Sequence, residues 1–415
     1  MLNKNENFII IIGAGIAGVA TAYYLSEKLP TYKIKVIDKL SPLSFTTSCS
    51  GENFREYWPQ PFMNKFVSRS IDLMKDLNKA HPSLFELKYS GYDFVSSVQN
   101  HSIFPSDNSE NNIEVLTKIS EIQKRKPYLD NSIKRVEHVV NAGSFEVHAL
   151  GSLLIKCAKA NGVKFIKGEV EDIKKDNGYE VYLKSEQPLK SKYLILASGP
   201  FINNHAKMLG YNLPIYNVKQ RKFVFTDKKG VIPRDMPFTI CADQQYLDWN
   251  QEEKELMQED SEYKWLLNEF PAGLHIKPEG QNQVKMGWAY NQKPEQPLWQ
   301  EHEDKEFVNI VLKGANRFIP GLSAYEDIPG PISHFTGNYT RTKDNLPIIG
   351  KLNKNLYIVG ALAGYGTMSA CAAGELITKS FSGERMPEYS QYFSAQRFQN
   401  QSLMEEIEKF PSGQL

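Results

Sequence analysis

Three glycines near the start of the chain have the spacing of a phosphate-binding turn. Gly13, Gly15 and Gly18 follow the apolar run 8–12, and Asp38 lies twenty residues after Gly18. In this pattern the first glycine permits a tight turn, the second lets a pyrophosphate approach the backbone, and the third allows close helix packing. The Asp38 carboxylate can accept hydrogen bonds from ribose hydroxyls. The spacing therefore predicts a dinucleotide site, with an accidental glycine turn as the alternative.

The elements that must position these residues form a βαβ unit. Residues 8–12 predict a buried parallel strand, 17–29 a helix that Pro30 ends, and 33–37 a second strand. The unpaired N–H groups at the start of the helix would face the phosphates. The glycines, Thr21 and two tyrosines make the same stretch a poor membrane span, and no signal peptide is expected.

A second strand–glycine–helix turn lies near the C-terminus. Gly360, Gly364 and Gly366 stand between an apolar strand at 356–359 and a helix that begins near Thr367. The positive end of such a helix could stabilise a developing anion, such as that of a reduced flavin. A plain turn is the alternative, but two turns of this kind in one chain favour a ligand site.

Composition excludes several classes of function. The 415 residues contain 49 Lys and Arg against 48 Asp and Glu, which argues against a general nucleic-acid binder. Cys49, Cys157, Cys241 and Cys371 show no C-x-x-C spacing, so neither a disulfide framework nor a zinc site is expected, and a reducing cytoplasm is the default.

The order of expected elements predicts an α/β fold, namely a Rossmann-like domain with an inserted antiparallel-sheet (α+β) domain. We expect the first domain to comprise 1–54, 141–214 and 336–415, and the inserted domain to comprise 55–140 and 215–335. Further elements expected include helices at 63–80, 113–125 and 147–161, strands at 193–197, 223–226 and 283–288, and a solvated acidic helix at 251–269.

Several motifs together resemble the D-amino-acid oxidase family of FAD enzymes, which includes glycine and sarcosine oxidases. They are GAGIAG with Asp38, GEVEDI, YLILASGP, VKMGW, TKDNLPIIG and GYGTM, in patches from Phe8 to about Phe381. The resemblance implies an FAD site and no metal. Its ADP half would be held by Gly13, Ala14, Gly15, Ile16, Ala17, Gly18, Asp38, Lys39, Val170, Ala197, Ser198 and Gly199. The isoalloxazine would be surrounded by Ser48, Cys49, Ser50, Gly51, Asn53, Phe54, Arg55, Gly337, Gly364, Tyr365, Gly366, Thr367 and Met368.

The chain departs from the family at three functional positions. Gly337 stands where sarcosine oxidases have the cysteine that tethers flavin, so noncovalent FAD is expected, with a link through Cys49 as a remote alternative. Met368 replaces a substrate-binding lysine, and Tyr339 replaces a substrate-binding arginine. A substrate carboxylate still requires a cation. Arg55 and Arg221 are the candidates, and a purely structural function is the alternative for each.

The remaining candidates are a lysine that the resemblance suggests and several possible pocket walls. Lys285, in VKMGW, matches the lysine that activates oxygen in sarcosine-type oxidases; the alternative is a solvent-facing strand lysine. Trp288, Tyr339, Tyr365 and His334 are candidate pocket walls, and His334 could take a proton, although each is equally consistent with a place in the core.

The function that the resemblance implies is FAD-dependent oxidation of a C–N bond in a small-molecule amine or amino acid. Hydride would pass to the flavin, leaving an imine that water hydrolyses. Oxygen or another acceptor would take the electrons. The alternatives are a dehydrogenase that reduces a quinone or protein, oxidation of a C–O substrate such as glycerol phosphate, and a flavoprotein assembly factor without turnover. We expect a cytoplasmic protein with no membrane span; the substrate, the electron acceptor and the oligomeric state stay open.

Overall fold

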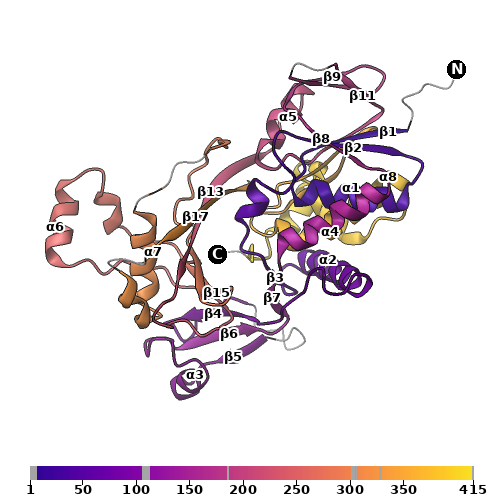
Figure 1. The fold of residues 1–415 in the computed structure, drawn as a ribbon. Coiled ribbons are helices and arrows are strands. Elements are labelled where there is room, and N and C mark those ends of the chain that lie inside the picture. The colour runs from indigo at the N-terminus through magenta and orange to yellow at the C-terminus, as the bar shows by residue number, and fades with distance from the viewer. Residues whose placement is uncertain are drawn as a thin grey trace.

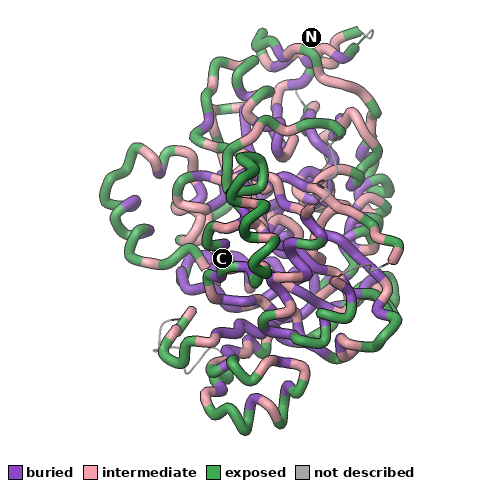
Figure 2. The backbone as a smooth tube through the Cα atoms, turned by 90° about the vertical axis from the view of Figure 1, so that its left-hand side faces the viewer, coloured by how far each residue is buried: buried purple, intermediate pink, exposed green. Residues whose placement is uncertain are grey.

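The structure is a computed structural model that describes residues 7–104, 113–184, 187–300, 304, 306–326 and 330–413. Two sheets organise the described chain, a mainly parallel one and a large antiparallel one (Figure 1). Figure 2 shows that buried segments run through the centre of the molecule and that exposed segments surround them.

The parallel sheet has six strands in the order β18-β19-β12-β1-β2-β8. All neighbours are parallel except the edge strand β18, which is antiparallel to β19. The strands are β1 (Phe8–Ile12), β2 (Lys33–Asp38), β8 (Lys164–Lys167), β12 (Tyr193–Leu196), β18 (Ile348–Asn353) and β19 (Leu356–Gly360). This order places β1 in the middle, with the ends of β2 and β12 on either side of the first glycine turn.

Both faces of this sheet are covered. Ile9 and Ile11 pack in one core with residues of α1 (Ile16–Lys28), α2 (Pro61–Ala80), α4 (Val147–Ala160) and α8 (Gly366–Ser382). Ile10 and Ile12 pack in another core with β9 (Val170–Lys175), β10 (Tyr179–Leu183) and α5 (Ile202–Met208); β11 (Leu189–Ser191) completes a small sheet with β9 and β10. Burial on both faces explains why the strand is continuously apolar.

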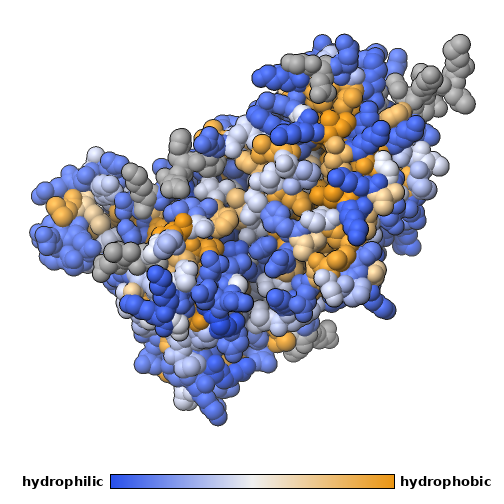
Figure 3. Space-filling model, in the orientation of Figure 1, coloured by the Kyte–Doolittle hydropathy of each residue, from blue (hydrophilic) through white to orange (hydrophobic). Residues whose placement is uncertain are grey.

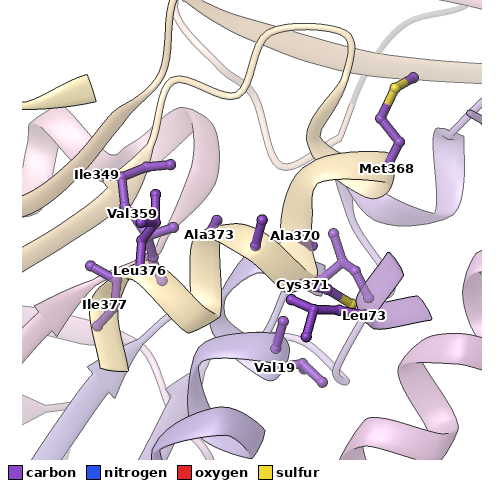
Figure 4. Packing of buried hydrophobic residues seen from close by; sticks show 14 of the residues in the cluster. Val19, Leu73, Ile349, Val359, Met368, Ala370, Cys371, Ala373, Leu376 and Ile377 are labelled. Atoms are coloured by element: carbon purple, nitrogen blue, oxygen red, sulfur yellow. The ribbon is translucent and has the colours of Figure 1, made fainter. Parts of the chain in front are cut away.

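Small residues let α8 approach α1 closely. Figure 4 shows Ala370, Cys371 and Ala373 of α8 in the same packed cluster as Val19 of α1 and Leu73 of α2. A Cβ on Gly374 would lie 2.8 Å from the backbone carbonyl carbon of Ala20. The backbone of α1 therefore occupies the space that a side chain at position 374 of α8 would need, so only glycine fits there.

The antiparallel sheet has eight strands in the order β17-β13-β16-β15-β14-β4-β6-β5, of which only β14 and β4 pair in parallel. They are β4 (Tyr92–Ser96), β5 (Ile113–Leu116), β6 (Arg135–Val139), β13 (Ile215–Thr226), β14 (Phe238–Cys241), β15 (His275–Glu279), β16 (Gln283–Gly287) and β17 (Ile332–Thr342). Helix α7 (Phe307–Asn316) packs in the core on one face of this sheet. Side chains on the opposite face, such as Phe94 and His275, line a cavity.

A few shorter elements complete the described chain. The two-stranded sheet of β3 (Asn53–Arg55) and β7 (Ala142–Ser144) lies between the two large sheets (Figure 1). Helix α6 (Gln251–Glu259) buries no residue, and its surface is mainly hydrophilic (Figure 3), which confirms the first half of the solvated helix predicted at 251–269; the second half contains only the 3-10 helix Lys264–Leu267, in which Leu266 is buried. The remaining helices are α3 (Ile119–Arg125) and α9 (Gln401–Ile407).

The predicted βαβ unit is confirmed, but the helix predicted at 113–125 is wrong in its first half. Residues 113–116 form β5, which pairs antiparallel with β6, and only 119–125 are helical. Ile113 and Val115 are β-branched and favour a strand once a partner strand is available. The division into two domains stays a prediction; β17 begins at Ile332 and therefore crosses the boundary expected at 336.

Candidate active site

A cavity of about 310 Å³, called here the first cavity, lies at the carboxyl ends of β1, β2 and β12 and extends to the start of α8. Its walls include the β1–α1 turn and most of the residues in 43–51, 197–201 and 359–367. Ligands of open α/β sheets bind outside the carboxyl ends of the strands, where neighbouring connections diverge. The first cavity has the position expected of a dinucleotide site.

The packing requires two glycines of the β1–α1 turn. Gly13 has a φ of +108°, and a Cβ there would lie 2.3 Å from the carbonyl oxygen of Ala197. A Cβ on Gly18 would lie 2.0 Å from the carbonyl oxygen of Gly13, so the helix could not approach the strand this closely. Gly15 lines the first cavity, and a Cβ there would meet only Thr47 Oγ1, at 3.4 Å. The predicted turn at Gly13 and close packing at Gly18 are confirmed.

Asp38 is held at the end of β2 beside the glycine turn. Its Oδ2 accepts a hydrogen bond from the Ala14 N–H at 2.7 Å, and its Oδ1 accepts one from the Leu40 N–H at 2.9 Å. Burial raises the pKa of the carboxyl group, and the two backbone donors oppose this shift without cancelling it. Each oxygen keeps a further lone pair for a ligand hydroxyl.

Thr47 caps the start of α1 from a distant loop. Its Oγ1 accepts a hydrogen bond from the Ile16 N–H at 3.1 Å, and it lies in the short 3-10 helix Thr46–Cys49. The loop that follows β2 is thereby fixed over the glycine turn, and both line the first cavity.

A buried ion pair supports the second glycine turn. Arg397 donates from Nε and Nη2 to the two carboxylate oxygens of Asp344, at 2.7 and 2.9 Å, and from Nη1 to the Pro347 carbonyl at 2.8 Å. The segment between Asp344 and Pro347 is therefore rigidly placed. Its Asn345 carbonyl accepts a hydrogen bond at 2.7 Å from the hydroxyl of Tyr365, the residue that precedes α8.

The first cavity also contains buried polar atoms that no described residue satisfies. These are Thr46 Oγ1, Gln220 Nε2, and both the oxygen and the nitrogen of the Asn338 amide. Buried polar groups almost always have a partner. The carbonyls, ring nitrogens and ribityl hydroxyls of a flavin are such partners, and a pyrophosphate suits the N–H groups at the start of α1. The residues present therefore fit FAD.

A second cavity, of about 130 Å³, adjoins the first. The residues that line both cavities are Ser50, Gly51, Gln220, Lys222, Tyr339, Gly364 and Thr367. The antiparallel sheet covers the second cavity through one cross-strand row, which consists of Phe94, Ile240, His275, Gly287 and Lys222. Paired residues of neighbouring strands present their side chains on the same face. All members of the row except Gly287 line the second cavity.

Two lysines and two glutamates beside this row neutralise one another. Lys277 lies 3.1 Å from Glu279, and Lys285 lies 3.3 Å from Glu279 and 3.4 Å from Glu52. Burial raises the pKa of Glu279, but the two lysines outweigh it and hold that pKa below its usual value. Burial lowers the pKa of Lys277.

Arg55 and Lys222 differ from these lysines, because neither forms a salt bridge within the described chain. Arg55 is 5% exposed, its guanidinium lies 4.2 Å from the centre of the Trp58 ring, and it donates to the Gly413 carbonyl. Burial lowers the pKa of Arg55 to about 10, so the group is still charged at neutral pH. Lys222 is 7% exposed and donates to the Cys49 carbonyl at 3.3 Å.

His275 is a neutral acceptor in the same row. Its Nδ1 lies 3.0 Å from the Gly273 carbonyl oxygen, which can only accept, so Nδ1 carries the proton and Nε2 has a free lone pair. Burial, and to a smaller extent the charge of Lys222, lowers the pKa of His275 to about 4.

Most residues proposed for the cofactor lie around the first cavity. Those that line it are Gly13, Gly15, Ile16, Ala17, Asp38, Lys39, Cys49, Ser50, Gly51, Val170, Ala197, Ser198, Gly199, Gly337, Gly364, Gly366 and Thr367. Those that line only the second cavity are Asn53, Arg55, Tyr365 and Met368. Those that line neither are Ala14, Gly18, Ser48 and Phe54.

The proposed catalytic residues are only partly brought together. Lys285, Arg55 and Tyr339 line the second cavity. His334 lines neither cavity and pairs with Phe223 across the β13–β17 ladder. Arg221 also lies outside both, 3.6 Å from Asp304.

Sequence reasoning missed Thr47, Gln220, Lys222, His275 and Asn338. The available signal was weak: Gln220 and Lys222 are polar residues two apart in a strand, which places them on one face. Which face of this strand lines the two cavities depends on the register in which four other strands of the sheet pair. No local sequence pattern contains that register.

Comparison with known proteins identifies the family. Residues 9–380 match the family model described as DAO, FAD dependent oxidoreductase, so the chain belongs to this family of FAD-dependent oxidoreductases. No curated protein sequence is similar enough to give a match.

Solved structures with a similar fold include three that cover nearly the whole chain. L-proline dehydrogenase from P. horikoshii has a TM-score of 0.73 and 19% identity, covering 95% of this chain and 98% of its own. Glycine oxidase from Geobacillus kaustophilus has a TM-score of 0.73 and 14% identity, covering 95% and 99%. Iminodiacetate oxidase from Chelativorans sp. BNC1 has a TM-score of 0.71 and 15% identity, covering 93% and 98%.

No described helix combines the length and apolar character needed to cross a membrane. Within the same residues, no group of three or more His, Cys, Asp or Glu side chains could hold a metal ion.

Proposed function

We propose that this FAD-dependent oxidoreductase oxidises a C–N bond in an amine that carries a carboxylate group. The observation that carries the proposal is the second cavity, which adjoins the first and contains the buried cations Arg55 and Lys222. A buried charge without a partner is costly, so a cavity that keeps such charges favours an anionic ligand. The proteins of similar fold named above are a proline dehydrogenase and oxidases of glycine and iminodiacetate, which agrees with an amine substrate.

The first cavity would bind the cofactor, and the second cavity would bind the substrate. Residues of the first cavity would hold FAD noncovalently, with Asp38 on the ribose and the start of α1 on the pyrophosphate. The flavin would supply the two-electron acceptor. The start of α8 would place its positive end near the ring, and Tyr365 and Met368 would help to exclude water from the second cavity.

His275 replaces His334 as the residue best placed to contact the amine. Its Nε2 lone pair belongs to a side chain in the second cavity, and its Nδ1–H is already used by Gly273. With a pKa of about 4 the ring is neutral at physiological pH and accepts a hydrogen bond from a substrate N–H. We propose that His275 orients the amine nitrogen; the low pKa makes it an acceptor and not a strong base.

Three further parts of the proposal rest on the sequence. The segments 1–54, 141–214 and 336–415 would form the FAD-binding domain, and 55–140 and 215–335 the substrate domain. Lys285 would assist the transfer of electrons to oxygen, if oxygen is the acceptor. A cytoplasmic location fits four cysteines that are all free.

Anaerobic mixing of the FAD-loaded protein with matched substrates tests the proposal. Each amino acid or N-substituted amino acid is paired with the 2-hydroxy acid of the same carbon skeleton, and flavin absorbance is followed. We expect some amines to bleach the flavin and their hydroxy analogues to leave it oxidised. Bleaching by hydroxy acids instead would identify a C–O oxidoreductase. A flavin that every compound leaves yellow would favour the non-catalytic alternative.

A further inference from the structure

The two cations of the second cavity that form no salt bridge with any described residue, Arg55 and Lys222, lie toward opposite ends of the cross-strand row. Arg55 lies beside the first member, with its guanidinium carbon 5.6 Å from the centre of the Phe94 ring, and Lys222 is the last member. Phe94 and Lys222 belong to β4 and β13, between which lie β14, β15 and β16. With about 4.8 Å between neighbouring strands, the row is about 19 Å long.

Among the residues that the structure describes, the neighbours of each cation leave its charge uncompensated. Arg55 faces Trp58, Tyr57 and Tyr92, and it donates a hydrogen bond to the neutral Gly413 carbonyl. Lys222 lies 5.8 Å from the centre of the Tyr339 ring and donates to the Cys49 carbonyl. Rings and carbonyls attract a cation through partial charges, but they do not neutralise it as a carboxylate would.

The middle of the row carries no net charge. His275 is the third of the five members and presents the neutral Nε2 acceptor. The nearby Lys277 and Lys285 are paired with Glu279 and Glu52. Along the row the cavity therefore offers a cation, a neutral hydrogen-bond acceptor and a second cation.

We propose that the substrate is an amine with two carboxylate groups, one bound by Arg55 and the other by Lys222, with its nitrogen beside His275. Because the two cations are separated along the row, a single carboxylate does not reach both. A dicarboxylic amine neutralises each buried charge and places its N–H donor at the acceptor in the middle. This inference rests on the proposed function and narrows its substrate class.

Unreactive analogues test the inference through binding alone. In the thioether diacids 3,3′-thiodipropionate, 4,4′-thiodibutyrate and 6,6′-thiodihexanoate a sulfur replaces the amine, so no C–N bond can be oxidised, and the series covers increasing separations of the two carboxylates. Each diacid is compared with its monoamide by calorimetric titration of the full-length FAD-loaded protein, with perturbation of the flavin spectrum as a second readout. We expect the best-fitting diacid to bind about thirtyfold or more tightly than its monoamide, since the amide leaves one buried cation unpaired. Equal binding of every diacid in the series and its own monoamide would overturn the inference.

Substitution of Lys222 identifies the second anchor. In Lys222→Met only Arg55 remains, so the diacid and its monoamide should bind equally and the thirtyfold difference should disappear. Lys222→Gln repeats the test with a polar side chain, and Lys28→Met, which removes an exposed lysine paired with Glu384, should keep the full difference. A difference that persists in both Lys222 variants would overturn the assignment of Lys222.

Failure of the dicarboxylate inference can be distinguished from failure of the proposed function. If monocarboxylic amines bleach the flavin as well as dicarboxylic amines do, the proposed C–N oxidation stands and the dicarboxylate inference fails. If only hydroxy acids bleach it, the proposed function fails, whatever the analogues show.

Discussion

Replacement of Arg397 by methionine should destabilise the protein at a point that supports the active site. Arg397 is 1% exposed, and Asp344 accepts two of its hydrogen bonds, at 2.7 and 2.9 Å. In Arg397→Met the Asp344 carboxylate stays buried without its counter-charge. The Thr342 hydroxyl and the Leu346 N–H, at 2.7 and 3.1 Å, remain as its donors.

The expected loss of unfolding free energy in Arg397→Met follows from the burial of the Arg397–Asp344 ion pair. Removing one partner of a buried ion pair costs about 3–5 kcal/mol, because the other charge is left uncompensated. Arg69 offers a matched control, since it forms the same fork with Glu375 at 3.1 and 2.6 Å, but its side chain is 40% exposed. Solvent screens that pair, so Arg69→Met should cost no more than about 1 kcal/mol.

Urea unfolding of the FAD-loaded variants measures both costs. The double variant Asp344→Asn/Arg397→Met should lose less stability than the sum of the two single variants, because it leaves neither charge alone. FAD affinity should fall in Arg397→Met, because Asp344–Pro347 positions the Asn345 carbonyl that holds Tyr365 at the start of α8. A cost in Arg397→Met as small as that in Arg69→Met would refute the reasoning.

The same pair gives a pH dependence with a defined sign. Burial raises the pKa of Asp344, but the hydrogen bonds and charge of Arg397 outweigh it, so the folded-state pKa lies below the usual value. The pair therefore adds stability above the unfolded pKa of about 3.9 and loses it as the pH falls through the lower folded value. The stability difference between wild type and Asp344→Asn should be constant at neutral pH and shrink below about pH 4.

Four further outcomes are expected. Asp38→Asn should weaken FAD binding by about 1–3 kcal/mol in a titration of the apoprotein, and unchanged affinity would exclude Asp38 as a ribose ligand. Acid precipitation should release the flavin; a yellow pellet would indicate a covalent link, for which Cys49 is the first place to look because it lies against Gly337. Lys285→Met should slow reoxidation by oxygen more than reduction by substrate in stopped-flow experiments, and equal losses would contradict that function. Glycine and sarcosine should be poor substrates, because Met368 and Tyr339 stand where related oxidases are expected to have the lysine and the arginine that bind the substrate carboxylate. Rapid turnover of either compound would refute this expectation.

The parts of the site that depend on local sequence could be predicted. The turn at Gly13, the close packing at Gly18 and the position of Asp38 follow from a βαβ unit whose residues are adjacent in the chain. The helix expected at 113–125 failed because β6 is available to pair with Ile113–Leu116, and that pairing is not a local property.

The substrate side could not be predicted for the same physical reason. Lys222 and His275 are 53 residues apart, and they meet only because β13, β16 and β15 pair in one register. Arg397 was also missed, since its partner Asp344 lies 53 residues earlier and no periodic pattern links the two. Arg55 was found because a family resemblance pointed to its segment, and the structure adds that its charge is buried without a carboxylate partner in the described chain.

The most direct test of the central claim is a diffraction measurement on the FAD-loaded protein soaked with an unreactive thioether acid. We expect flavin in the first cavity, and the ligand in the second cavity with a carboxylate within hydrogen-bond distance of the Arg55 guanidinium. A carboxylate group bound away from both Arg55 and Lys222, or flavin density outside the first cavity, would contradict it.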